Sequence, residues 1–147
     1  MGVAAGLRAS VSAVVADADT AIQAGSGDVP VLATPRLLAL AEAATVAAIS
    51  PHLPQGVTYV GTSASLEHRR ASPIGAELVV EAELTEIDGR RLVFSFIARE
   101  SGHQTGAPDD DGGDDRVVGA GTVERVLVDR QAFLARAAGG HHGRGLV

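Results

Sequence analysis

The feature that most constrains the fold of this chain is the apolar segment Thr34–Ile49, which reads T-P-R-L-L-A-L-A-E-A-A-T-V-A-A-I. Leucine and alanine fill the segment, and both residue types favour the α-helix. Thr34 is a good N-cap, since its hydroxyl can accept a hydrogen bond from a free N–H, and Pro35 suits the first helical position. Ser50-Pro51 ends the helix, because a proline disfavours helical geometry in the residue before it. The pattern predicts one long central helix.

Between Leu37 and Ile49 this helix carries a single charged residue, Glu42. A helix that is apolar nearly all round is usually buried. A carboxylate in such a helix is costly to desolvate, so it needs a partner or a chemical task. Glu42 is therefore the first candidate for a functional residue.

Composition excludes several classes of function. The 147 residues carry a formal net charge of -6 and no cysteine. The negative charge argues against nucleic acid as a main partner, and the lack of thiols excludes disulfides and thiolate chemistry. The N-terminal apolar stretch is short and broken by Arg8, which makes a poor signal peptide, and no apolar run approaches the roughly 18 residues of a membrane span. We expect a soluble, cytoplasmic protein with one domain at residues 1–138.

The rest of the chain shows alternation of apolar and polar residues, which indicates β-strands. Five segments are expected to be strands: 7–15, 57–69, 76–87, 91–100 and 117–128. Asp88-Gly89 is a strong hairpin signal between the third and fourth of them. Residues 16–30 predict a loop with a short helical turn that could act as a lid, and residues 129–138 predict a short terminal helix.

The same alternation predicts which side chains face the core. On the segment 57–69, His68 shares a face with Ala64 and Leu66, and this face is expected to point inward. The inward side chains expected on the next two strands are Leu78, Val80, Ala82, Leu84, Leu92, Phe94, Phe96 and Ala98.

Two segments fall outside this pattern. Residues 101–116 contain the run D-D-D-G-G-D-D, and this composition predicts a solvated loop. A calcium site is the alternative, but the spacing does not match an EF-hand loop. Residues 139–147 are rich in glycine and histidine and predict a disordered tail, on which His141 and His142 are weak evidence for metal binding. No metal site is therefore predicted.

One apolar helix and an antiparallel sheet of about five strands must bury each other. The simplest packing wraps the sheet around the helix, and this α+β arrangement is the hotdog fold. Edge strands and helix ends stay exposed in a single subunit, so a second copy is expected. The chain is predicted to form a homodimer, and further pairing into a tetramer is left open.

Five runs carry a family resemblance by their order and spacing. They are A-T-P-R-L-L-A-L-A-E-A-A from Ala33, Y-V-G-T-S-A-S-L-E-H from Tyr59, S-P-I-G-A-E-L-V-V-E-A-E-L from Ser72, D-G-R-R-L-V-F from Asp88 and G-A-G-T-V-E-R from Gly119. Together they resemble hotdog-fold thioesterases of the fluoroacetyl-CoA thioesterase type. The resemblance covers about residues 7–138, apart from the acidic insertion.

The resemblance implies a site. The family's catalytic threonine stands eight residues before a helical glutamate and matches Thr34, with Glu42 as the glutamate, and its histidine at the end of the next strand matches His68. The family's glycine near the thioester carbonyl matches Gly61, and the arginine of its G-x-G-T-x-E-R run matches Arg125. The resemblance thus implies three catalytic residues, two substrate contacts and no cofactor.

Thioester hydrolysis suits these residue types, because it needs a base or nucleophile, a proton carrier and donors for the oxyanion. Glu42 could activate water or attack the carbonyl, and His68 could carry the proton to the leaving thiolate. Thr34 could hydrogen-bond the carboxylate or the substrate. Thr34 and Glu42 lie roughly 12 Å apart along the helix axis, so substrate, water, His68 or the partner subunit must link them.

Other interpretations stay open at this stage. Thr34 also fits a plain helix cap, Glu42 the partner of a buried Arg125, and His68 a structural histidine. A non-catalytic protein that binds an acyl thioester would keep the same pocket. A hotdog enoyl-CoA hydratase is disfavoured, since the expected D-x-x-x-x-H signature is not found around His68.

The acyl group is a separate question. The run A-G-S-G-D-V-P-V-L at residues 24–32 has no aromatic residue, whereas the fluoroacetyl-CoA enzyme carries bulky aromatics before its threonine. The resemblance therefore implies an acyl-CoA thioesterase-like hydrolase, and we expect a small or medium acyl group, with CoA or a carrier protein as the thiol.

Overall fold

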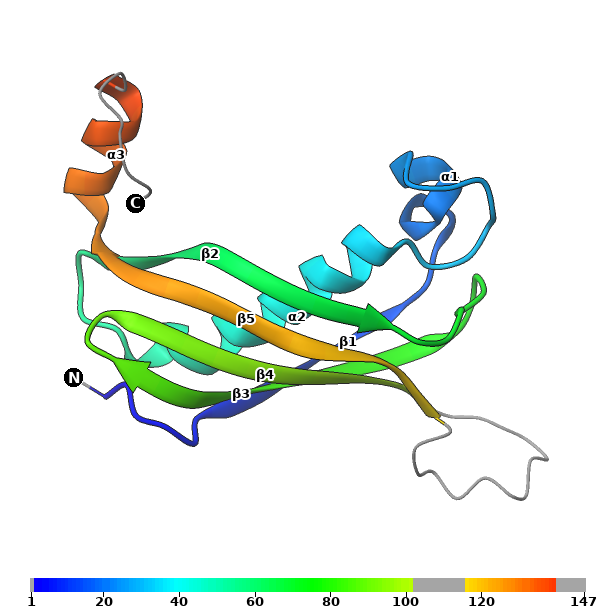
Figure 1. Cartoon of the computed structure of the whole chain (residues 1–147), viewed down its shortest axis with the longest axis horizontal. Coiled ribbons are helices and arrows are strands. Elements are labelled where there is room, and N and C mark those ends of the chain that lie inside the picture. Colours follow the sequence, from blue (N-terminus) through cyan, green and yellow to red (C-terminus); the bar gives the residue numbers. More distant parts are fainter. Residues whose placement is uncertain (1, 102–115, 140–147) are drawn as a thin grey trace.

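The structure, a computed structural model, describes residues 2–101 and 116–139. In this part of the chain, five strands form one antiparallel sheet in the order β1-β3-β4-β5-β2 (Figure 1). The strands are β1 (Arg8–Val14), β2 (Val57–His68), β3 (Glu77–Asp88), β4 (Arg91–Glu100) and β5 (Val117–Asp129). Because β1 and β2 are the two edges, β2 has only β5 as a neighbour. Most of the predicted acidic loop 101–116 and of the tail 139–147 lies outside the described residues.

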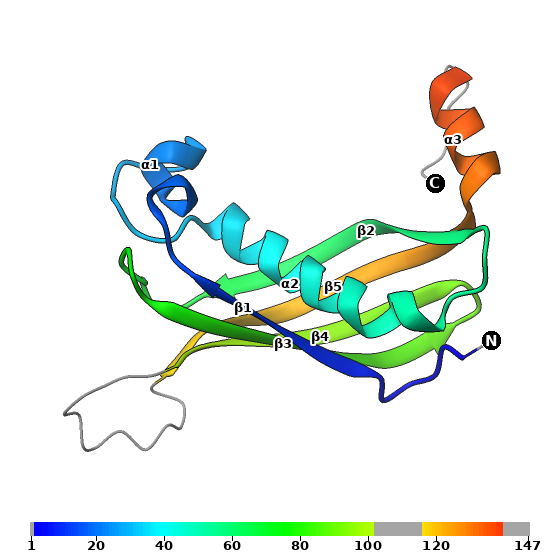
Figure 2. The same cartoon turned by 180° about the vertical axis from the view of Figure 1, so that it is seen from behind.

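One long helix, α2 (Thr34–Ile49), lies along one face of the sheet, as Figure 2 shows. The short helices η1 (Asp17–Asp19) and α1 (Ala21–Ala24) come before it, and η2 (Ser50–His52) follows. At the end of the molecule opposite to α1, the helix α3 (Arg130–Gly139) projects from the end of β5 (Figure 1). None of the helices within the described residues is long and apolar enough to cross a membrane.

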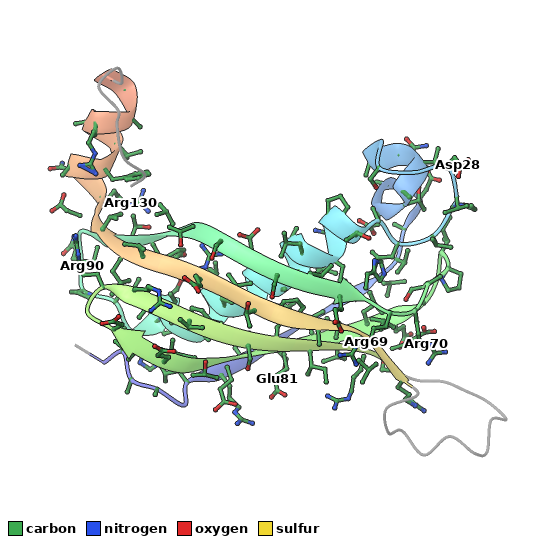
Figure 3. The ribbon with its side chains drawn as sticks, viewed as in Figure 1. Asp28, Arg69, Arg70, Glu81, Arg90 and Arg130 are labelled. Carbon is green, nitrogen blue, oxygen red and sulfur yellow. The ribbon has the colours of Figure 1, made fainter. Side chains whose placement is uncertain are left out.

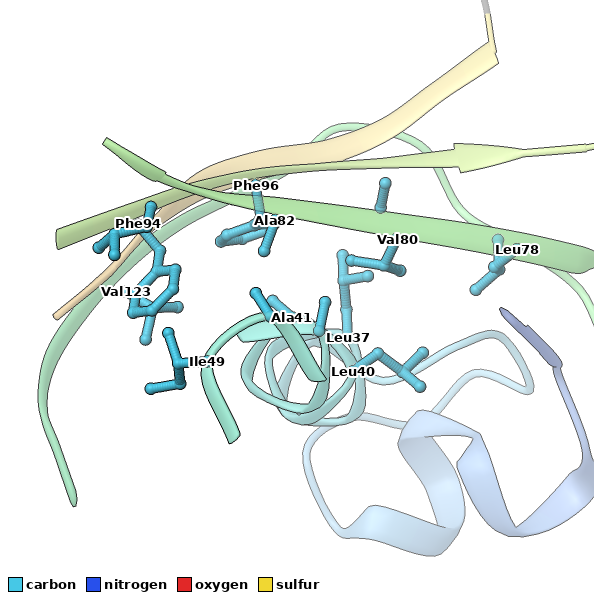
Figure 4. Packing of buried hydrophobic residues seen from close by; sticks show 14 of the residues in the cluster. Leu37, Leu40, Ala41, Ile49, Leu78, Val80, Ala82, Phe94, Phe96 and Val123 are labelled. Carbon is cyan, nitrogen blue, oxygen red and sulfur yellow. The ribbon is translucent and has the colours of Figure 1, made fainter. Parts of the chain in front are cut away.

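The hydrophobic core lies between α2 and the sheet (Figure 4). The inward side chains predicted for β3 and β4 are all buried, with at most 4% of any of them exposed. The helix contributes Leu37, Leu40, Ala41, Ala44 and Ile49 to the same core. Each large apolar side chain buried in this way favours folding by about 1.5–3 kcal/mol. The predicted layering of one helix against one antiparallel sheet is therefore confirmed.

The expectation that α2 is buried on all sides was wrong for the single chain. Ala39, Ala43 and Ala47 on its outer face are exposed, and 41% of the Glu42 side chain is exposed. The physical reason is that the sheet covers only one side of the helix. The outer face is apolar but made of small residues, which suits close packing against another helix.

Two local features of the strands differ from simple alternation. A bulge between Gly61 and Ser63 shifts the register of β2 against β5. Tyr59 packs toward the core before this bulge and Leu66 after it, so the inward positions change from odd to even numbers. The predicted hairpin is present, but its two loop residues are Gly89-Arg90, and Asp88 pairs with Arg91. Gly89 has φ 64°, a conformation that glycine adopts without strain.

Candidate active site

The first group of candidate residues lies where α2 begins and β2 ends. Thr34 Oγ1 lies 2.8 Å from His68 Nδ1. The prediction that Thr34 is the N-cap was wrong, because Ala33 occupies the cap and Thr34 makes the first helical turn with Pro35. The reason is that the Thr34 hydroxyl forms a hydrogen bond with the imidazole of His68 on β2 instead of with a backbone N–H of its own helix. We call Thr34 and His68 the hydroxyl–imidazole pair.

The surroundings of His68 favour its neutral form. Burial lowers the pKa of His68, and the nearby polar backbone of Arg70 raises it in part. Desolvation acts this way because it penalises the charged imidazolium. Nε2 is buried, and among the described residues no hydrogen-bond partner reaches it. One ring nitrogen is therefore oriented by Thr34, while the other is buried without a hydrogen-bond partner among the described residues.

A cavity of about 370 Å³ adjoins this pair. One wall is the segment from α1 to Thr34, and the other is the turn at residues 68–71, at the end of the molecule where Asp28, Arg69 and Arg70 lie (Figure 3). The apolar lining consists of Ala21, Val29, Val31, Leu32 and Ala71. The segment predicted as a lid thus lies beside the candidate site.

Glu42 belongs to a second group, which lies two turns further along α2. Arg125 of β5 is only 6% exposed, and its Nη2 lies 3.8 Å from Glu42 Oε2. Its Nε donates to Thr45 Oγ1 at 2.8 Å, and its Cζ lies 5.3 Å from the centre of the Tyr59 ring. Burial lowers the pKa of Arg125, while the charges of Glu42 and Tyr59 raise it. We call Glu42 and Arg125 the carboxylate–guanidinium pair.

Gly61 lies directly against this second pair. A Cβ at this position would lie 3.1 Å from Glu42 Oε2 and 3.9 Å from Arg125 Nη1. Such a distance is tighter than most contacts of a real Cβ, so a side chain here would displace the carboxylate. The missing side chain lets β2 approach Glu42 closely.

The structure therefore divides the residues that the sequence singled out. Thr34 meets His68, and Glu42 meets Arg125 and Gly61, but no hydrogen bond or ion pair in the described part of one chain joins the two groups. The separation of roughly 12 Å along the helix still has to be bridged. Among the described residues, no cluster of three or more His, Asp or Glu is arranged to hold a metal ion.

Sequence reasoning missed two members of the second group, Thr45 and Tyr59. Thr45 is three residues after Glu42, and this spacing places both on one face of a helix. It is also a polar residue among buried apolar neighbours, which was a usable signal. Tyr59 is the only tyrosine of the chain, but its contact with Arg125 depends on strand pairing.

Comparisons with known proteins show the family of the chain. The family model of fluoroacetyl-CoA-specific thioesterases matches residues 15–109. The fluoroacetyl-CoA thioesterase of Streptantibioticus cattleyicolor is 36% identical over 106 residues, which cover 72% of this chain and 67% of that protein.

Solved structures extend the likeness to nearly the whole chain. The fluoroacetyl-CoA thioesterase FlK has a TM-score of 0.80 and 28% identity, and the match covers 96% of this chain and 99% of that one. A thioesterase superfamily member from Thermus thermophilus, with a TM-score of 0.77, 22% identity and coverage of 95% and 96%, shares the fold. The predicted hotdog fold and family resemblance are thereby confirmed. The chain belongs to the fluoroacetyl-CoA thioesterase family, and it is a hotdog-fold thioester hydrolase of the acyl-CoA thioesterase type.

Proposed function

We propose that this protein hydrolyses the CoA thioester of a small or medium acyl group, and that Thr34, Glu42 and His68 carry out the reaction without a cofactor. The observation that carries the proposal is the 2.8 Å contact between Thr34 Oγ1 and His68 Nδ1 beside a cavity of about 370 Å³. The named activity of the relatives supports the reaction class. A variant of FlK solved in complex with acetyl-CoA supports an acyl-CoA as the substrate.

His68 acts as the proton carrier in this proposal. Its lowered pKa keeps the imidazole neutral at pH 7, so the ring can accept a proton and then deliver it to the leaving sulfur. Thr34 fixes the ring through Nδ1, which leaves Nε2 for the transfer. A positioned proton carrier of this kind contributes about 10²- to 10⁴-fold to a rate.

Glu42 supplies the attack on the thioester carbonyl, either by removing a proton from water or as a nucleophile. Both routes need an ionised carboxylate, and the Arg125 guanidinium lies 3.8 Å from it as its partner in an ion pair. We assign Arg125 to the substrate site through this carboxylate, with Gly61 leaving space for the thioester carbonyl. The products are a free acid and a free thiol, so the proton lost by water ends on the sulfur.

We propose further that the complete site forms in a homodimer, with the hydroxyl–imidazole pair of one subunit facing the carboxylate–guanidinium pair of the other. The distance between the two groups within one chain supports this, as do the exposed alanines of α2 and the free edge of β2. Each subunit would contribute one domain, residues 1–138, and the protein would act in the cytoplasm. Sedimentation of the purified protein measures the oligomeric state and distinguishes a dimer from a tetramer.

The experiment that tests the function is release of free thiol from a panel of acyl-CoAs, from acetyl to long-chain and aromatic groups. Glu42→Gln is run beside the wild type. We expect release by the wild type, and lost turnover in Glu42→Gln with an unchanged circular dichroism spectrum. An active Glu42→Gln enzyme would contradict the role of Glu42. A wild type that binds acyl-CoA without releasing thiol would identify a binding protein instead.

A further inference from the structure

We propose that Thr45 is a positioning residue that orients the Glu42 carboxylate through Arg125, an inference that rests on the proposed role of Glu42. Thr45 is 0% exposed, although threonine carries a hydroxyl that must find partners when buried. It stands on α2 between the core and β5. No part of the family resemblance or of the proposed reaction assigns it a role.

The two hydrogen bonds of the Thr45 hydroxyl have a fixed direction. Its Oγ1 lies 2.7 Å from the backbone oxygen of Glu42 and 2.8 Å from Arg125 Nε. A carbonyl oxygen only accepts, and an arginine N–H only donates. Thr45 must therefore donate its single proton to the Glu42 carbonyl and use a lone pair to accept from Arg125. A replacement at this position needs both a proton and a lone pair.

Holding Nε sets the direction of the whole guanidinium, because that group is planar and rigid. Nη2 then lies 3.4 Å from the Glu42 backbone oxygen and 3.8 Å from Glu42 Oε2. The Tyr59 ring lies 5.3 Å from Cζ, within the distance of a cation–π contact. The guanidinium thus reaches the carboxylate from one direction, which the Thr45 hydroxyl determines.

Loss of the hydroxyl would disturb this order. Arg125 is buried, so an Nε–H without an acceptor would be costly, and rotation of the guanidinium is the simplest relief. Rotation moves Nη2 away from Glu42 Oε2 and leaves the carboxylate, itself 41% exposed, free to take other positions. A misplacement of about 1 Å in a catalytic group can cost about a hundredfold in rate.

The test compares Thr45→Val, which keeps the shape and removes the hydroxyl, with Thr45→Ser, which keeps the hydroxyl and removes a methyl group. We expect Thr45→Val to lower kcat at least tenfold with KM within about twofold, since the contact acts on the transition state. Thr45→Ser should stay within about threefold of the wild type in kcat. Thr85→Val is the matched control, because it removes a hydroxyl that donates to Val93 on the exposed part of β3.

A merely structural role would change the melting temperature of both variants without separating their kcat values. Equal kcat for the folded Val and Ser variants would overturn the proposal. If Thr45→Val does not fold, Thr45→Ala at low temperature replaces it with the same expected fall in kcat.

A wild type that releases no thiol would refute the proposed function, and a second readout then judges Thr45 by itself. The Nε–H signal of Arg125 in a ¹⁵N NMR spectrum should be protected from exchange in the wild type and in Thr45→Ser. It should exchange at least tenfold faster in Thr45→Val, because the acceptor is gone. Equal protection in all three proteins would overturn the positioning role.

Discussion

The two groups of candidate residues share the helix α2 but differ in charge and surroundings. The hydroxyl–imidazole pair is neutral, lies at the start of the helix and adjoins a cavity of about 370 Å³. The carboxylate–guanidinium pair is ionic, and its arginine is almost fully buried between helix and sheet. In our proposal, the first group moves a proton beside the substrate, whereas the second fixes the position of a carboxylate. We propose that each group is half of a hydrolytic site and that two subunits complete it.

The largest effect that separates the two groups is expected from His68→Ala. This change removes the proposed proton carrier while leaving the core intact, because His68 lies at the end of β2 and is only partly buried. We expect kcat to fall about a hundredfold or more. The melting temperature should change little, as measured by circular dichroism. A collapse in stability instead would favour a structural role for the histidine.

Mixing two inactive variants tests directly whether the site is shared between two subunits. Glu42→Gln and His68→Ala subunits are refolded together in equal amounts. If the site is shared, half of the dimers are mixed and one of their two sites is intact, so about a quarter of wild-type activity should return. If one chain holds the whole site, mixing restores nothing.

The matched control for this mixing is Thr34→Ala with His68→Ala. Both changes damage the hydroxyl–imidazole pair, so a mixed dimer still has a defect in each of its sites. We expect no recovery from this combination. Recovery in both mixtures would point to an effect of refolding and would contradict the shared site.

These tests depend on geometry that the sequence predicted only in part. The burial of Leu78 and Phe94 followed from alternation, because a strand with one covered face has a period of two. The bulge after Gly61 has no such signature, so the side chains facing α2 before and after it could not both be assigned by alternation. Alternation predicts side-chain direction where the strand is regular, and it fails where a bulge adds one residue to the strand.

The candidate site shows the same limit. The first turn of α2 was located correctly, but Thr34 was assigned to cap it, whereas its hydroxyl bonds to a residue 34 positions away. A helix-capping rule considers only neighbouring residues, so it could not predict this contact. Glu42 was expected to be buried, and its exposure follows from the uncovered outer face of the helix. The partner of Thr34 and the exposure of Glu42 depend on tertiary contacts and, in our proposal, on a second subunit, so the sequence alone could not predict them.

A smaller effect is expected from Gly61→Ala, which acts on the carboxylate–guanidinium pair alone. The new Cβ would lie 3.1 Å from Glu42 Oε2, the end of a flexible side chain that can yield. We expect kcat to fall about tenfold, because the carboxylate is displaced by less than 1 Å. The melting temperature should be nearly unchanged.

Gly121→Ala is the contrasting variant for this comparison. Its Cβ would clash with the backbone oxygen of Ser65, and the strand pairing of β2 and β5 would have to shift. We expect a large loss of thermal stability from Gly121→Ala. An unchanged rate in Gly61→Ala would mean that the exact place of the carboxylate does not matter, which would also weaken the role assigned to Thr45.

The smallest effect concerns pH and distinguishes the neutral pair from the ionic one. Burial lowers the pKa of His68 in the folded protein below its ordinary value of 6.5. The unfolded chain then binds more protons than the folded one as the pH falls through this range. The free energy of unfolding should therefore decrease below about pH 6.5 as the pH approaches the folded pKa, and His68→Ala should lack this component.

Melting temperatures of wild type and His68→Ala at pH 7.5 and pH 5.5 measure this difference. We expect the wild type to lose more on acidification than the variant, by a few degrees at most. The same lowered pKa places the acid limb of the wild-type rate below pH 6.5, because the carrier must be neutral to accept a proton. If the wild-type rate already falls above pH 6.5, and His68→Ala lacks this fall, the pKa of His68 would be raised rather than lowered. The imidazole would then carry a charge near neutral pH, and both groups would be ionic.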